Sequence, residues 1–203
     1  DVTFIARGER LEALRSRGLT VKSGKGDFSI RARATDDPSE VGPVDLLLFC
    51  VKSYDTESAI RQVLPMVGQE TIVLSLQNGI DNEEKIASFV GKEKVLAGVA
   101  YIGASVLEPG VVLHQEGGKI VFGELNDGLS DRVMRLKAFF DQYDLPAEGS
   151  PGMKKILWAK LAWNAPFNAI NTLVGGPVKT IIGNSHTLEL ARRVTEEVVT
   201  VAN

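Results

Sequence analysis

Cysteine and histidine are scarce in this sequence of 203 residues, which holds one cysteine, Cys50, and two histidines, His114 and His186. A single cysteine excludes an internal disulfide framework and is typical of a reducing compartment. Cys50 lies inside an apolar run, so we expect a buried and unreactive thiol. Neither histidine has metal-ligand spacing to another candidate, and structural or exposed roles are favoured for both.

Blocks of a single charge and long apolar runs are also missing. Lysine and arginine number 23 and aspartate and glutamate 26, which leaves a net charge of −3. Without a basic block we expect no nucleic-acid partner and no anionic membrane surface as partner. No apolar run approaches the roughly 20 residues that span a bilayer. The composition, 44% apolar and 24% charged, is that of an ordinary globular protein, which we expect to be cytoplasmic.

Several signatures of catalysis and nucleotide binding are absent. The sequence shows no Ser-His-Asp arrangement, no paired-carboxylate motif, no P-loop and no G-x-G-x-x-G loop. It begins at Asp1, enters a strand at once, and ends at Asn203 while still in a helical pattern. Because chains seldom begin inside a buried strand, we expect further residues before Asp1, and likewise after Asn203.

Strand and helix patterns alternate over the first 148 residues and predict an α/β fold with a Rossmann-type, doubly wound sheet. The expected strands are 2–6, 45–51, 71–76, 95–104 and a short one at 147–148, with a hairpin of 20–23 and 28–33. A further pair of edge strands, 111–114 and 119–122, is expected around the sequence QEGG. The expected helices are 9–17, 52–67, 82–89 and 131–143. The continuous apolar run 45–51 is typical of a strand covered on both faces.

From Ser150 onward the pattern is helical only, and the breakers Gly149, Ser150, Pro151 and Gly152 mark the change. We therefore expect residues 1–149 to form a nucleotide-binding, Rossmann-like domain. Residues 150–203 would then begin an all-helical domain that carries substrate and catalytic residues.

Residues 154–174 predict one long helix, mostly apolar all round and therefore buried. Four polar residues interrupt it at helical spacing: Lys160, Asn164, Asn168 and Asn171. Because each helical residue turns the chain by about 100°, these four side chains lie within an arc of roughly 80° on one face. Polar groups on a buried face need partners, which are either other protein groups or a polar ligand. Pro166 removes the amide that would bond the Ala162 carbonyl, so we expect a bend.

Lys160 allows two interpretations. Its ammonium either reaches water along its aliphatic stem, or lies in a pocket where burial lowers its pKa. In the second case Lys160 can donate a proton to a carbonyl oxygen as negative charge develops there.

Three more polar residues follow predicted strands at their carboxyl ends, where ligands bind in such sheets: Arg7, Lys52 and Asn78. Each has an ordinary alternative, since a charged residue there is often only solvated, and an asparagine before glycine often makes the turn. An arginine at the position of Arg7 suits the 2′-phosphate of NADP rather than the ribose of NAD. Glu9 is close enough in sequence to compete for that position.

The order of five segments resembles the 2-dehydropantoate 2-reductase (ketopantoate reductase) family along nearly the whole chain. The segments are VTFIARGERLEALRSRGL, VDLLLFCVKSYDTESAI, LSLQNGIDNEEKI, GVVLHQEGGKIVFGE and ILWAKLAWNAPFNAIN. The successive motifs VK-x-Y-D, QNG-[IM] and W-x-KL-x-x-N-x-x-x-N make the resemblance specific. It implies a Rossmann domain, a helical domain and an active site in the cleft between them.

The resemblance also implies reduction of ketopantoate, a small 2-oxo acid, to pantoate with NADPH, on the way to pantothenate and coenzyme A. Lys160 would be the general acid, and Asn164 and Asn168 would bind substrate. Asn78 and Lys52 would line the nicotinamide side of the cleft, and Arg7 would meet the 2′-phosphate.

The family's glycine-rich loop and its further substrate-binding serine and glutamate fall outside residues 1–203. If these residues were the whole polypeptide, we would expect weak NADPH binding and little turnover.

Two alternatives to this function remain open. One is a paralogous NADPH-dependent reductase of another 2-oxo acid, and the other is a non-catalytic NADP(H)-binding sensor. The long apolar helices make a homodimer plausible in each case.

Overall fold

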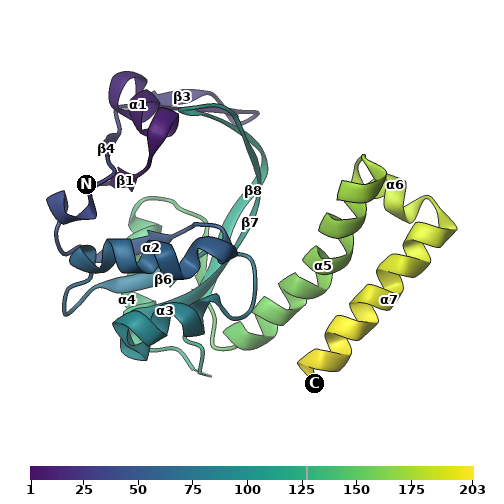
Figure 1. The fold of residues 1–203 in the computed structure, drawn as a ribbon. Coiled ribbons are helices and arrows are strands. Elements are labelled where there is room, and N and C mark those ends of the chain that lie inside the picture. Colours follow the sequence, from purple (N-terminus) through teal and green to yellow (C-terminus); the bar gives the residue numbers. More distant parts are fainter. Residues whose placement is uncertain (127) are drawn as a thin grey trace.

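The computed structural model describes residues 1–126 and 128–203. Its strands are β1 (Thr3–Ile5), β2 (Leu19–Ser23), β3 (Phe28–Ile30), β4 (Arg33–Thr35), β5 (Leu46–Phe49), β6 (Ile72–Ser75), β7 (Val95–Glu108), β8 (Val111–Gly123) and β9 (Ala147–Gly149). Its α-helices are α1 (Gly8–Arg17), α2 (Thr56–Val63), α3 (Asn82–Val90), α4 (Asp131–Gln142), α5 (Met153–Val174), α6 (Val178–Ile182) and α7 (Ser185–Ala202). Strands and helices alternate as far as β9 and only helices follow, which confirms the predicted α/β fold with a helical C-terminal part (Figure 1).

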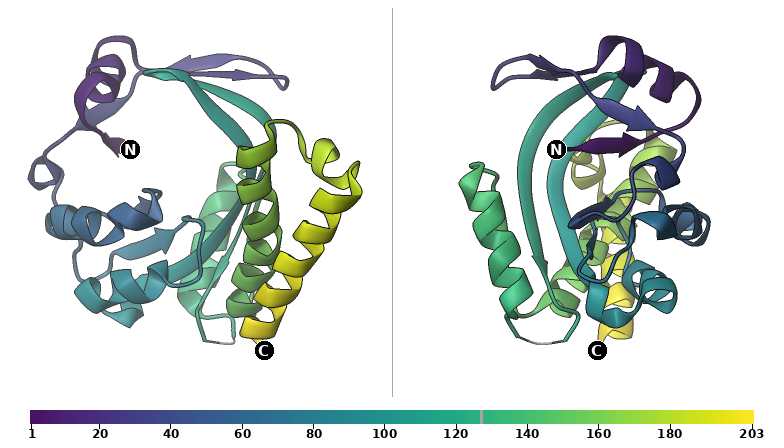
Figure 2. Two further views of the ribbon diagram at one scale, coloured as in Figure 1. Left: turned by 45° about the vertical axis from the view of Figure 1, so that its right-hand side comes forward. Right: turned by 90° about the vertical axis from the view of Figure 1, so that its left-hand side faces the viewer.

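The centre of the molecule is a layer of three parallel strands, β5, β6 and β7, with helices on both faces. On one face α2 and α3 bury a cluster around Ile60, Val73 and Ile86. On the other face α4 packs Leu136 and Phe140 against strand residues such as Phe122. Figure 2 shows α4 on the opposite side of the sheet from α2 and α3, the arrangement of a doubly wound sheet.

Strands β7 and β8 form a long antiparallel hairpin that curves away from this layer (Figures 1 and 2). Strand β8 pairs in parallel with β2, which in turn pairs with β3. A separate parallel pair, β1 with β4, lies beside α1, so that the mixed sheet and its neighbours form a half-barrel. The predicted pair of edge strands at 111–114 and 119–122 is wrong, because β8 runs unbroken through both. Gly117 and Gly118 have positive φ, 76° and 119°, and form an irregularity opposite Tyr101 and Ile102 instead of a turn.

The expectation that the run 45–51 is covered on both faces is also wrong. Leu47 and Phe49 point into the core, at 8% and 3% exposure, whereas Leu48 between them is 47% exposed. Cys50 follows the end of β5 and is exposed as a residue, which corrects the predicted buried cysteine, although burial still raises the pKa of its thiol. An unbroken apolar run does not show which of its two faces has a neighbour.

Helix α5 spans 22 residues as expected, but it is not buried all round. Its buried residues are Met153, Leu157, Pro166 and Ile170. By contrast, Trp163 is 54% and Leu173 82% exposed. Helix α5 packs on β7 at its N-terminal half and on α7 along its length, and its remaining face lies open. The prediction of burial failed because apolar composition does not specify which neighbours are present.

Pro166 lies inside α5 without ending the helix. The Ala162 carbonyl, which loses its usual amide partner to this proline, accepts a long hydrogen bond of 3.5 Å from Thr195 Oγ1 of α7. Thr195 Oγ1 also donates to the Ala191 carbonyl in its own helix, at 3.0 Å. The unpaired carbonyl in α5 is therefore partly satisfied by the helix packed against it.

Candidate active site

Lys160 projects from α5 toward β7, where its Nζ lies over the ring of Tyr101, 4.7 Å from the ring centroid. The side chain is half-buried, and burial lowers the pKa of Lys160. Of the two interpretations open from the sequence, the geometry favours a lysine held in a partly desolvated position over one that extends freely into water.

Asn164 lies one helical turn after Lys160 on the same face of α5. Its Nδ2 donates to Oδ1 of Asn78, 3.2 Å away, in the turn between β6 and α3. This bond joins residues 86 positions apart and links the α/β part of the chain to the helical part. Asn78, Lys160 and Asn164, three of the residues singled out in the sequence, thus lie at one junction.

Hydrogen bonds from buried polar side chains stabilise the turn at Asn78. The Asn78 carbonyl accepts from Asn82 Nδ2 at 3.0 Å, and Asn82 Oδ1 accepts from Thr56 Oγ1 at 3.2 Å. Gln77 Nε2 donates both to Thr56 Oγ1 and to the Val51 carbonyl, each at 2.9 Å. At Gly79, with φ of 127°, an added Cβ would lie 2.7 Å from Asn82 Nδ2. The turn is therefore preorganised: its backbone is fixed while the Asn78 side chain stays exposed.

Sequence reasoning missed Tyr101, Gln77, Thr56 and Asn82, which support the three site residues. The signal available for Gln77 was its place in QNG beside Asn78, and for Asn82 its place at the start of a helix. Nothing in the sequence indicated Tyr101, because its role depends on a helix that follows about sixty residues later.

The rest of the polar stripe on α5 is not joined to this junction. Asn168 is exposed one turn beyond Asn164, and its carbonyl accepts from Thr172 Oγ1 at 2.9 Å. Asn171 is half-buried, and its Oδ1 has no partner within the part of the chain that the structure describes. The exposed Asn168 side chain is thus accessible to a small ligand. Asn171 lies about two helical turns beyond Asn164 and is therefore further from the junction.

Arg7 and Lys52 are both exposed and follow β1 and β5. Arg7 is the N-cap of α1, and no side chain caps the amides of the first turn. The space beside Gly8 is open, because a Cβ added there would meet nothing within 4 Å. A guanidinium beside open helix amides suits a phosphate group in general. Helix α1 lies across the molecule from α5 (Figures 1 and 2), so Arg7 does not join the Lys160 junction.

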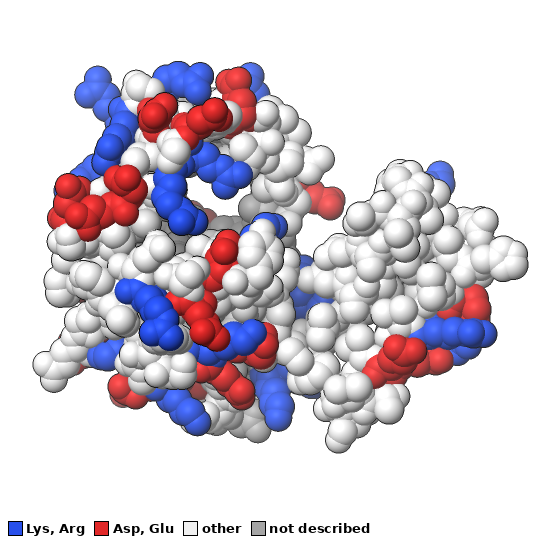
Figure 3. Space-filling view, in the orientation of Figure 1, with Lys and Arg blue, Asp and Glu red and all other residues white. Residues whose placement is uncertain are grey.

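The charges on the face shown in Figure 3 are mixed in sign over the α/β part, without a single-sign block, and the surface of α5 and α6 is largely uncharged. The described residues contain no group of three or more histidine, cysteine, aspartate or glutamate side chains placed to hold a metal ion. His114 is structural: its Nδ1 lies 2.9 Å from Ser23 Oγ and its Nε2 3.2 Å from the Gly117 carbonyl. Among the described helices, none is long and apolar enough to cross a membrane.

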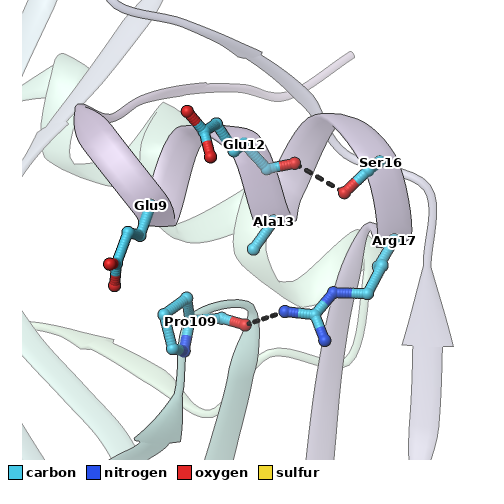
Figure 4. A pocket seen from close by; sticks show the side chains of 6 residues that line it. All are labelled: Glu9, Glu12, Ala13, Ser16, Arg17 and Pro109. Carbon is cyan, nitrogen blue, oxygen red and sulfur yellow. Dashed lines mark hydrogen bonds between the residues drawn. The ribbon is translucent and has the colours of Figure 1, made fainter.

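A shallow polar pocket of about 320 Å³ lies between α1 and the turn from β7 to β8 (Figure 4). Glu9, Glu12 and Arg17 line it, and Arg17 Nη2 donates to the Pro109 carbonyl at 3.0 Å. None of the predicted site residues faces this pocket. We therefore assign the candidate site to the junction of α5 with the Asn78 turn, where the lysine and the amides converge.

The fold agrees with comparisons to known proteins. The sequence model of the family described as "Ketopantoate reductase PanE/ApbA" matches residues 1–127, and the model of its C-terminal part matches residues 153–203. The chain therefore belongs to the ketopantoate reductase family, as the sequence resemblance predicted.

Two archaeal relatives illustrate the similarity. The chain is 34% identical over 197 residues to the 2-dehydropantoate 2-reductase of Pyrococcus horikoshii and 32% identical over 197 residues to that of Archaeoglobus fulgidus. In both comparisons 97% of this chain is covered but only 64% of the relative. The chain thus spans slightly less than two thirds of the length of these relatives.

Solved structures show the same fold. The crystal structure of 2-dehydropantoate 2-reductase from Geobacter metallireducens matches with a TM-score of 0.93 and 35% identity, covering 100% of this chain and 67% of that one. A D-mandelate dehydrogenase with bound NADH and anilino(oxo)acetate matches with a TM-score of 0.88 at 22% identity, which supports the fold alone.

Proposed function

We propose that the protein reduces 2-dehydropantoate (ketopantoate) to pantoate with NADPH, as a step toward pantothenate and coenzyme A. The observation that carries this proposal is the junction of a half-buried lysine, Lys160, with the hydrogen-bonded pair Asn78 and Asn164. Reduction of a 2-oxo acid needs a proton donor for the ketone oxygen and polar groups that orient the acid. The family membership of the chain selects this reaction among those that such a site supports.

In this mechanism Lys160 donates a proton to the carbonyl oxygen of the substrate as negative charge develops there. Because burial lowers the pKa of Lys160, the ammonium releases its proton more easily near neutral pH than a solvated lysine does. Asn164 and Asn168 lie one turn apart on α5, and their amides bind the hydroxyl and carboxylate groups of the substrate. Asn78 orients the ketone end from the facing turn.

Arg7, Lys52 and Asn78 would bind the dinucleotide, which supplies the hydride when bound. Arg7 and the open first turn of α1 suit a 2′-phosphate, which supports NADP over NAD. Lys52 and Asn78 follow the neighbouring parallel strands β5 and β6, so both lie at the carboxyl edge of the sheet. The carboxylate of Glu9, in the first turn of α1, would compete with a phosphate for Arg7.

The experiment that tests this function follows NADPH oxidation by absorbance, with ketopantoate and protein expressed from its complete reading frame. We expect steady oxidation that falls roughly 10²- to 10⁴-fold in Lys160→Ala, because general acid catalysis contributes about that factor. Lys154→Ala is the matched control, since it removes an exposed lysine from the same helix.

Other outcomes separate the alternatives. Oxidation with a different 2-oxo acid but not with ketopantoate would indicate a paralogous reductase. Binding of NADPH without oxidation of any 2-oxo acid would indicate a sensor. Oxidation of ketopantoate that is unchanged in Lys160→Ala would retain the reaction and overturn the role of Lys160.

A further inference from the structure

The ring beneath Lys160 belongs to a strand that the family motifs do not include. Tyr101 lies in β7 just after the buried segment Val95–Val99, at the point where the strand leaves the central layer, and is 41% exposed. Its ring is the group that Lys160 Nζ faces at 4.7 Å from the centroid. The face of an aromatic ring carries negative potential and attracts an ammonium at this distance.

The backbone around Tyr101 is held in place by the irregularity in β8. The register between β7 and β8 shifts between Tyr101 and Ile102, opposite Gly117. A Cβ added to Gly117 would lie 2.3 Å from the Tyr101 carbonyl, so the two strands approach closely there. The backbone that carries Tyr101 is thus held by strand pairing and does not belong to a loop.

The charged residue opposite Tyr101 already has a partner. Lys119 lies opposite Tyr101 across the hairpin, and its Nζ bonds Glu148 Oε2 on β9 at 2.5 Å. The lowering of the pKa of Lys160 arises from burial. The aromatic ring is therefore the group positioned to attract the Lys160 ammonium.

We propose that Tyr101 is a positioning residue, whose ring face holds the ammonium of Lys160 on the side of α5 that carries Asn164. This inference rests on the proposed function in one respect, that Lys160 is the proton donor. The ring attracts the ammonium but not the neutral amine, so it opposes the effect of burial and keeps the proton on Lys160 until transfer. The ring face supplies this effect, and the phenol hydroxyl is not needed.

The test measures the charge state of Lys160 directly, in the full-length protein. The protein is trace-labelled with an amine-reactive reagent over a pH series, and the labelled Lys160 peptide is quantified by mass spectrometry. The result is a midpoint, the pH at which half of the Lys160 amine is reactive. We expect Tyr101→Leu to lower this midpoint by about 0.5 to 1 pH unit, and Tyr101→Phe to restore it. Lys154, exposed in the same helix, serves as the internal reference in every sample.

Activity gives a second readout. We expect Tyr101→Leu to lower kcat roughly tenfold with little change in KM, because the substrate still binds while the proton donor is misplaced. The conservative Tyr101→Phe should restore kcat. If Tyr101→Leu does not fold, Tyr101→Thr replaces it, since a β-branched residue suits the strand.

The outcomes distinguish this inference from the proposed function. Equal Lys160 midpoints in the leucine and phenylalanine variants would overturn the role of Tyr101, whatever the activity. A lowered midpoint in Tyr101→Leu, in a protein that reduces no 2-oxo acid, would support the contact and reject the function instead.

Discussion

At the scale of single residues, Glu83 is a buried carboxylate in α3, the helix that follows the Asn78 turn. It lies in the first turn of α3 at 1% exposure, and both of its carboxylate oxygens lack a partner in the part of the chain that the structure describes. Burial raises the pKa of Glu83. A buried carboxylate without a partner costs free energy of folding in its charged form.

The sign of the pH dependence follows from this raised pKa. Between the ordinary pKa of glutamate and the raised value, the folded state binds more protons than the unfolded state, so stability falls as pH rises through that window. We expect Glu83→Gln to remove this fall and to stabilise the protein by about 1–3 kcal/mol at pH 7 and above. Urea denaturation at several pH values checks the prediction, with Glu84→Gln as the control at an exposed neighbour.

Arg7 gives a second prediction at this scale. We expect Arg7→Ala in the full-length protein to weaken NADPH binding about 10- to 100-fold, because a charged hydrogen bond contributes roughly 1.5–3 kcal/mol. NADH lacks the 2′-phosphate, so its affinity should change little. Titration of both cofactors by fluorescence measures the two affinities, and Arg31→Ala is a matched change at another exposed arginine. Equal losses for both cofactors would contradict the assignment of Arg7 to the 2′-phosphate.

At the scale of elements, the β7–β8 hairpin depends on glycine at position 117. Gly117 has φ of 76°, and an added Cβ would clash with the Tyr101 carbonyl at 2.3 Å. We expect Gly117→Ala to destabilise the protein by about 1–3 kcal/mol, through backbone strain and forced separation of the strands. Gly24→Ala is the control, because an added Cβ there meets nothing within 4 Å. Urea denaturation measures both, and similar losses in the two variants would contradict the role of the irregularity.

The same hairpin shows which elements the sequence pattern alone can predict. The sequence predicted the strands β5 and β6 and the helices α1, α3, α4 and α5 to within a few residues, because their apolar periodicity is local. It divided β8 at QEGG, because a glycine pair usually marks a turn. Only the pairing with β7 turns these glycines into an irregularity within one long strand.

At the scale of the whole molecule, the two parts of the chain differ in how much they bury. Residues of β6 and β7 such as Val73, Leu74 and Leu96 are fully buried. The helical part buries a small cluster of Ile170, Ile181 and Ala191, and α7 contributes only Ala191 to it. The helices are therefore held by much less apolar surface than the sheet.

This difference predicts uneven protection against amide hydrogen exchange in the 203-residue chain. We expect amides of β6 and of the first half of β7 to exchange only through global unfolding, and those of α7 to exchange at much lower free energy through local opening. Hydrogen exchange followed by mass spectrometry resolves the two regions. Equal protection of α7 and β6 would show that the helices and the sheet unfold as one unit.

The sequence by itself determined the order of strands and helices, the polar stripe on α5 and the family, because periodicity and motifs are properties of short segments. The contact of Asn78 with Asn164 and the ring beneath Lys160 were decided only by the tertiary structure, since each joins residues more than fifty positions apart. The same holds for the exposure of Leu48 and Trp163 within residues 1–203. Burial and polar contacts at these positions depend on which distant segment the fold brings alongside, and no local pattern carries that information.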